Sequence, residues 1–180
     1  MEYDKEIMDD VLKLIQQGKV LELGAGEGNE SLFLAEKGFE VTCLDINEKN
    51  IKKIQDKAEK ENLKIKTIIK DLREFKIEES FDLIFSIATL HILEDKEIVL
   101  DLIKQMKEHT KTNGLNLLIV FRDSDPTCED PEDGYFGDEE LKEIYKDWKI
   151  ENYEIYDEYD DDDEQTNKLA YIIARKPKGA

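Results

Sequence analysis

Three glycines stand at alternate positions directly after a short apolar segment of this sequence. Lys19 to Leu23 reads as a strand, and Gly24, Gly26 and Gly28 follow it. Glycine permits a tight turn and lets a ligand approach the backbone closely. A helix that begins after such a turn presents its unpaired amide groups to the same place. This combination predicts an α/β protein that binds a ligand beyond the carboxyl ends of its strands.

Short apolar segments alternate with amphipathic ones along most of the chain. Ile51, Ile54 and Ala58 recur at helical spacing, and Phe81 to Ile87 is a continuous apolar run typical of a buried central strand. Repeated strand–helix units imply a parallel sheet covered on both faces. We also expect helices ending near Gly18, over Glu30 to Lys37, around Ile98 to Met106 and around Leu141 to Trp148, strands over Phe39 to Leu44, Leu63 to Lys70 and Leu115 to Phe121, and a turn at Asn113-Gly114.

The C-terminal part departs from simple repetition. Lys149 to Tyr156 and Leu169 to Arg175 look like a closing antiparallel strand pair with no helix between them. The acidic stretch Tyr156 to Glu164 is expected to be a solvated hairpin loop, with a weak cation site as the alternative. The predicted fold is α/β, a Rossmann-like, doubly wound, mostly parallel sheet with a C-terminal antiparallel pair. We expect one domain over residues 1–180.

Charge and cysteine content exclude several classes of function. The formal net charge is −19, so nucleic acids and anionic membranes would be repelled. Cys43 lies in an apolar run and should be buried, and no cysteine or histidine cluster predicts a metal site. No segment resembles a signal peptide or a membrane span, so a cytoplasmic protein with a small-molecule substrate is expected. The oligomeric state cannot be deduced from the pattern.

The spacing of the glycine segment favours one cofactor class. A dinucleotide fingerprint requires a glycine where this sequence has Asn29, which opposes a nicotinamide-dependent oxidoreductase. The order acidic-x-Gly-x-Gly-x-Gly, beginning at Glu22, resembles motif I of the class I methyltransferases. That resemblance implies the class I methyltransferase fold and S-adenosyl-L-methionine as cofactor.

Polar residues end the neighbouring strands at the same predicted edge. Asp45 ends the second strand, where a carboxylate can accept hydrogen bonds from both hydroxyls of a ribose. Asp71 ends the third strand, and the family resemblance implies that its carboxylate and the next backbone amide, of Leu72, meet the adenine. Ser86 and Ile87 end the fourth strand and are expected to face the same crevice. The expected cofactor-binding residues are therefore Glu22, Gly24, Ala25, Gly26, Gly28, Asp45, Ile46, Asp71, Leu72, Ser86 and Ile87.

Two residues are candidates for contact with the methyl acceptor. His91 follows the fourth strand and either projects toward the transferred methyl group or is a partly exposed histidine at a helix start. Arg122 follows the fifth strand and either neutralises an anionic acceptor or pairs with Asp123 or Asp125. Methyl transfer from a sulfonium requires mainly proximity and orientation, so no catalytic triad is needed. Nothing near Cys128 in the sequence would lower its pKa.

Longer segments resemble one family of these enzymes, the tellurite-resistance methyltransferases or TehB family. The resembling segments are Gly28 to Gly38, Met106 to Ile119, and Glu140 to Trp148 followed by Tyr153. The resemblance implies methylation of tellurium and selenium oxyanions, with a functional His-Arg pair and a further arginine near the last strand pair. This sequence has the acidic Tyr156 to Asn167 stretch there instead, with Lys168 as the nearest cation.

Three hypotheses follow from these patterns. The first is a methyltransferase that acts on a small neutral or cationic molecule, or on a soft thiol or chalcogen nucleophile. The second keeps tellurite or selenite as acceptor, with Arg122 and Lys168 supplying positive charge. The third is a non-catalytic module that binds S-adenosylmethionine.

Overall fold

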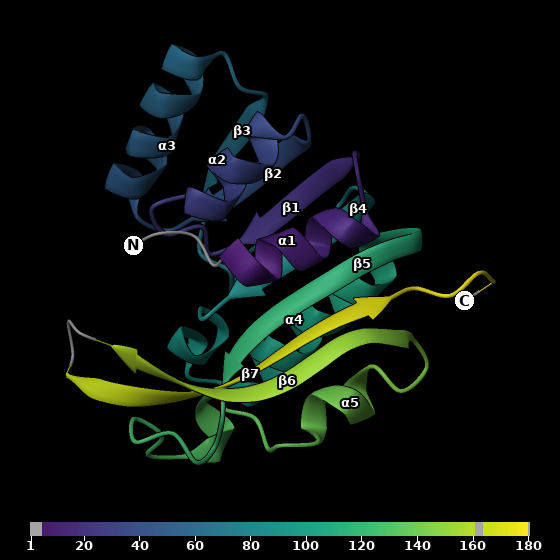
Figure 1. Cartoon of the computed structure of the whole chain (residues 1–180). Helices are drawn as coiled ribbons and strands as arrows, with labels where there is room; N and C mark the ends of the chain where they lie inside the picture. Colours follow the sequence, from purple (N-terminus) through teal and green to yellow (C-terminus); the bar gives the residue numbers. More distant parts are fainter. Residues whose placement is uncertain (1–4, 161–163, 180) are drawn as a thin grey trace.

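The computed structural model describes residues 5–160 and 164–179. Within these ranges, seven strands form one sheet in the order β3-β2-β1-β4-β5-β7-β6 (Figure 1). The strands are β1 (Lys19–Leu23), β2 (Glu40–Asp45), β3 (Ile65–Ile69), β4 (Phe81–Ile87), β5 (Thr110–Phe121), β6 (Lys149–Asp160) and β7 (Gln165–Arg175). The helices are α1 (Lys5–Leu14), α2 (Asn29–Glu36), α3 (Glu48–Glu61), α4 (Lys96–His109) and α5 (Glu140–Ile144), with the 3₁₀ turns η1 (Leu90–Leu93) and η2 (Pro131–Asp133).

The sheet is doubly wound, as the sequence predicts. The strands β1 to β5 run parallel to one another, and β7 pairs antiparallel with both β5 and β6. The chain winds outward from β1 to β3 in one direction and from β4 onward in the other. The order therefore reverses between β1 and β4, and the crevice at such a reversal is where open α/β sheets bind ligands.

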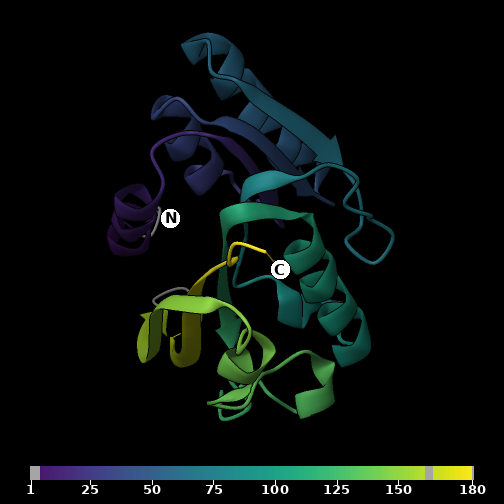
Figure 2. The same ribbon diagram turned by 90° about the vertical axis from the view of Figure 1, so that its right-hand side faces the viewer.

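Two helical layers cover the sheet. The buried side chains of α1, α2 and α3 belong to one hydrophobic cluster, whereas those of α4 and α5 belong to the other. Figure 2 shows α1 and α4 on opposite sides of the sheet. No helix in the described part of the chain is long and apolar enough to span a membrane.

Local sequence signals explain where the helices begin and end. The helix α3 buries Ile51, Ile54 and Ala58, the three residues that recur at helical spacing. Its first turn is capped by the Asn47 side chain, which accepts a hydrogen bond from the Lys49 amide at 3.0 Å. Beyond the end of α2, Gly38 has a φ of 93°, the left-handed conformation that terminates helices.

The predicted turn at Asn113-Gly114 is wrong, because both residues belong to β5. Phe81 pairs with Thr110 and Leu83 with Leu115, so β5 carries extra residues opposite β4 and bulges there. Asn113 adopts a φ of 65° within this bulge. A Cβ atom on Gly114 would lie 2.9 Å from the Asp82 carbonyl oxygen, so glycine is needed for close approach of the strands.

More of the acidic stretch belongs to the sheet than the sequence predicted. β6 continues through Asp160, and Tyr156 to Asp160 pair residue by residue with β7. This pairing supplies backbone hydrogen bonds that a loop would lack, while the carboxylates stay at the surface. The predicted strand end at Tyr156 therefore falls four residues short, the predicted hairpin loop is wrong for residues 157–160, and residues 161–163 lie outside the described ranges.

Candidate functional site

The glycine segment forms a tight turn between β1 and α2. The amides of Gly24 and Ala25 both donate to the carbonyl oxygen of Leu44, at 3.0 and 2.9 Å, which ties the turn to β2. The three glycines have φ values of 81°, 50° and 77°, where a side chain is strained. A Cβ atom on Gly24 would collide with Thr89 and one on Gly28 with Ile54, whereas one on Gly26 would meet no atom within 4 Å. The space beside Gly26 is therefore open.

Glu22 lies beneath this turn rather than in it. Its side chain is only 2% exposed and accepts a hydrogen bond from the Ser31 hydroxyl. Burial, reinforced by the nearby charge of Glu30, raises the pKa of Glu22 well above its usual range. Glu22 therefore joins β1 to α2 from below. Ser31 was missed from the sequence because no spacing signal connects it with Glu22.

Asp45 connects the end of β2 to the glycine turn. One carboxylate oxygen accepts from the Gly26 amide at 2.7 Å, and the other accepts from the Asn47 amide at 2.8 Å. The next residue, Ile46, is 64% exposed despite its apolar side chain. The Asp45 carboxylate thus stands beside the open space at Gly26, and an exposed apolar side chain follows it in the chain.

The third and fourth strand ends differ from each other. Asp71 is held by Arg73, whose amide donates at 2.9 Å and whose guanidinium donates at 3.1 Å, so the pKa of Asp71 is lowered. Leu72 is buried. The expectation that Ser86 faces the crevice is wrong for its side chain, which is fully buried and donates to the Leu23 carbonyl at 2.8 Å. The side chain of Ile87, by contrast, is only partly buried.

Thr89 is a site-forming residue that the sequence analysis missed. Its hydroxyl lies 3.2 Å from the Gly24 carbonyl oxygen and 2.8 Å from that of Ile87. These contacts connect the β4 end to the glycine turn. A polar residue shortly after a predicted strand end was the available signal.

His91 lies in η1, among aromatic rings. Its ring centroid is 4.2 Å from that of Phe121 at the end of β5 and 6.0 Å from that of Tyr135. Burial lowers the pKa of His91, although the charge of Asp125 opposes this, so the imidazole is predominantly neutral near pH 7. Its Nδ1 atom is buried and has no hydrogen-bond partner among the described residues.

Arg122 forms ion pairs, but not with the residues that the sequence suggested. Its Nε donates to Asp138 at 2.7 Å, and its Nη1 lies 3.9 Å from Asp157. The expected pairing with Asp123 or Asp125 is thus replaced by contacts to the segment before α5 and to β6. Asp138 was not identifiable because it lies sixteen positions further along the chain.

The two cysteines fulfil their sequence-based expectations. Cys43 is buried, and burial raises its pKa to about 12. The pKa of Cys128 is also raised, by burial and by the surrounding aspartates, of which Asp123 has the largest effect. Neither thiol is activated as a nucleophile.

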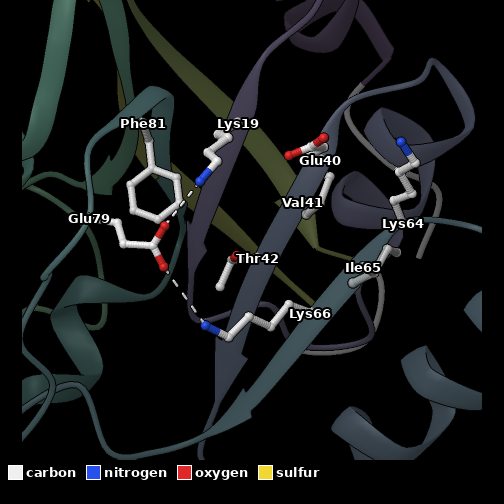
Figure 3. A pocket seen from close by; sticks show the side chains of 9 residues that line it. All are labelled: Lys19, Glu40, Val41, Thr42, Lys64, Ile65, Lys66, Glu79 and Phe81. Atoms are coloured by element: carbon white, nitrogen blue, oxygen red, sulfur yellow. Dashed lines mark hydrogen bonds and ion pairs between the residues drawn. The ribbon is translucent and has the colours of Figure 1, made fainter.

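A hollow of about 370 Å³ opens at the opposite edge of the sheet. It lies over the amino-terminal parts of β1, β2 and β3, where Glu79 bridges Lys19 at 3.1 Å and Lys66 at 4.0 Å (Figure 3). The glycine turn and Asp45 are at the carboxyl ends of the same strands. This hollow is therefore separate from the candidate site.

Comparison with known proteins identifies relatives of the whole chain. The family model described as "Tellurite resistance protein TehB" matches residues 2–174. A "Probable S-adenosyl-L-methionine-dependent methyltransferase TehB" from Haemophilus influenzae is 40% identical over 173 residues, which cover 93% of this chain and 60% of the relative. The chain thus spans about three fifths of that relative's length.

Solved structures agree with the fold. The crystal structure of TehB from Haemophilus influenzae matches with a TM-score of 0.85 and 36% identity, covering 95% of this chain and 62% of that one. The N-methyltransferase NodS from Bradyrhizobium japonicum WM9, in complex with S-adenosyl-L-homocysteine, matches with a TM-score of 0.75 and 20% identity, covering 97% and 88%. The class I methyltransferase fold predicted from the sequence is confirmed.

Proposed function

Since the chain belongs to the TehB family, we propose that it is an S-adenosylmethionine-dependent methyltransferase that acts on a small-molecule acceptor. The observation that carries the proposal is the open space at Gly26, bordered by the Asp45 carboxylate and followed in the chain by the exposed Ile46. A ribose diol needs an acceptor such as Asp45, and an adenine ring needs an apolar surface such as Ile46. The residues present therefore fit a nucleoside cofactor.

Each part of the cofactor has a group that suits it. Gly26 leaves room for the amino-acid portion close to the backbone, and Gly24, Ala25 and Gly28 form the turn that holds Gly26 there. The Asp71 carboxylate and the Leu72 amide suit the adenine edge, and Ile87 borders the methyl end. Glu22 and Ser86, both buried, support the turn from below. When bound, S-adenosylmethionine supplies a methyl group already activated by a positive sulfur.

The chain's own part in the reaction is to place the nucleophile. An acceptor near the ends of β4 and β5 would lie beside His91 and Phe121, which exclude water. Neutral His91 can take the proton that an N–H or S–H acceptor loses when it gains the methyl group. Proximity and orientation then account for most of the rate.

A second candidate has tellurite or selenite as acceptor, in keeping with the names of the family and its relatives. It requires an available positive charge near the acceptor, and Arg122 is the residue best placed to supply it. A third candidate, a non-catalytic binding module, would bind the cofactor without turnover on any acceptor.

Calorimetric titration with S-adenosylhomocysteine tests the proposal. We expect saturable binding to the wild type and roughly 10–100-fold weaker binding to Asp45→Ala, because hydrogen bonds to a charged group are lost. Asp56→Ala is the matched control, since Asp56 is an exposed carboxylate on α3 that pairs with Lys52. Absence of binding to the wild type would refute the proposed function. Binding without methyl transfer to thiols, amines, selenite or tellurite would favour the non-catalytic module.

A further inference from the structure

Arg122 is almost enclosed at the edge of the sheet where β5 ends. Its side chain is 14% exposed, and its Nε and Nη2 lie 2.7 and 2.6 Å from the same oxygen of Asp138. Asp157, on β6, approaches its Nη1 to 3.9 Å. Two carboxylates from separate elements therefore neutralise one cation, and each carboxylate is more than half exposed toward solvent.

The surrounding charges do not restore a positive potential. Lys96 pairs with Glu140 at 3.0 Å, and Lys168 stands directly opposite Asp157 in the β6–β7 pairing. Asp125 is only 4% exposed and accepts from the Lys168 amide at 2.6 Å. Burial, together with the charges of Asp123 and three other aspartates, raises the pKa of Cys128. This end of the molecule is thus anionic around a neutralised arginine.

We propose that Asp138 and Asp157 are specificity-determining residues that restrict the methyl acceptor to neutral or cationic nucleophiles. The inference rests on the proposed function and names the substrate class of that site. An anionic acceptor would approach two exposed carboxylates, and the guanidinium between them, that of Arg122, is already paired with both, which costs affinity. An uncharged thiol or an amine pays no such cost. Removing the two carboxylates should release Arg122 and reverse the preference.

Selenite is a suitable probe because it is a small oxyanion. The protein saturated with S-adenosylhomocysteine is titrated calorimetrically with selenite, as wild type and as the Asp138→Asn/Asp157→Asn variant. We expect no saturable binding to the wild type below about 1 mM and affinity at least roughly tenfold higher in the variant. The control is Glu139→Gln/Glu154→Gln, which removes two charges from the same two segments without touching Arg122.

The outcomes separate the two levels of the proposal. Saturable selenite binding to the wild type, or equal affinities in the variant and the control, would overturn the inference. If the wild type fails to bind S-adenosylhomocysteine, the proposed function fails and this inference with it. Thermal unfolding checks that the double variant is folded. Should it not fold, Asp157→Asn removes only the longer ion pair, and a smaller gain in selenite affinity over Glu154→Gln is expected.

Discussion

The two ends of the sheet's carboxyl edge are built in different ways. Around β1 and β2, the candidate site consists mainly of backbone, with the Gly26 amide held by Asp45 and the turn tied to the Leu44 carbonyl. Around β5 to β7 it consists of side chains that meet from distant parts of the chain, such as Arg122 with Asp157. The first arrangement follows from local spacing, and the second depends on tertiary packing.

This difference suggests which half can change its ligand. A backbone cradle keeps its shape when exposed side chains vary, because glycines and strand ends define it. Ion pairs between separate elements can be altered by one substitution without moving the sheet. The part of the site around β1 and β2, here called the glycine half, is therefore suited to a fixed cofactor. The part around the end of β5, β6 and β7, with His91 packed against Phe121, is called the β5–β7 half and is suited to a variable acceptor.

The largest expected effect tests the backbone cradle. Gly26→Ala places a methyl group in the open space and should weaken S-adenosylhomocysteine binding by roughly 5–150-fold, because overpacking costs about 1–3 kcal/mol. An alanine at this position is also strained, because φ is 50° and lies in the left-handed region. The substitution should therefore lower the free energy of unfolding by about 1–2 kcal/mol as well. Calorimetry and urea unfolding measure the two quantities.

Gly38→Ala is the matched control for this substitution. Gly38 also has positive φ, 93°, and open space around its Cβ position, but it terminates α2 away from the candidate site. It should lose similar stability while keeping wild-type affinity for S-adenosylhomocysteine. Equal loss of affinity in both variants would show that strain, rather than occupied space, weakens binding.

The sequence predicted the strands of both halves, including the antiparallel C-terminal pair, but missed side-chain contacts between separate elements, for one physical reason. β1 and β4 match their predicted bounds, because apolar runs and glycine turns are local signals. The partners of Glu22 and Arg122, namely Ser31 and Asp138, lie nine and sixteen residues further along and share no periodicity with them. The extended β6 was missed because its acidic composition hides a pairing that only β7 provides.

A medium effect is expected from Glu22, the buried carboxyl of the glycine half. Its pKa is raised above the reference value of 4.5, so the folded protein binds this proton more tightly than the unfolded chain does. Its contribution to stability is therefore full below about pH 4.5 and declines as the pH rises toward the folded-state pKa. The wild type should lose stability between pH 5 and pH 8 because Glu22 must give up its proton. Glu22→Gln should reduce this loss of unfolding free energy by at least about 1 kcal/mol.

Urea unfolding of both proteins at the two pH values measures this difference. Glu48→Gln, at the exposed start of α3, is the control, because it removes a carboxylate from the surface and leaves Glu22 in place. A parallel pH dependence of Glu22→Gln and the wild type would show that Glu22 carries no such penalty.

The smallest expected effect has the opposite sign and lies in the β5–β7 half. The pKa of His91 is lowered by burial below its reference value of 6.5, so the unfolded chain binds this proton more tightly. The stability that neutral His91 contributes is present above about pH 6.5 and is lost as the pH falls through the folded-state pKa. Because the ring is only partly buried, the expected loss between pH 7.5 and 5.5 is less than about 1 kcal/mol.

His91→Gln should remove this loss of stability at acid pH. His109→Gln is the matched control, because it replaces the histidine at the end of α4, whose Nδ1 lies 3.1 Å from the Glu79 carbonyl oxygen, and leaves His91 in place. The measurement is the difference between the unfolding free energies of each variant and the wild type at about pH 7.5 and at about pH 5.5. Glu22→Gln is expected to reduce the loss of unfolding free energy at alkaline pH, and His91→Gln the loss at acid pH. If both results are found, the two halves carry opposite and separable pH dependences. A single variant that flattened both would mean that the halves are coupled through β4, the strand between them.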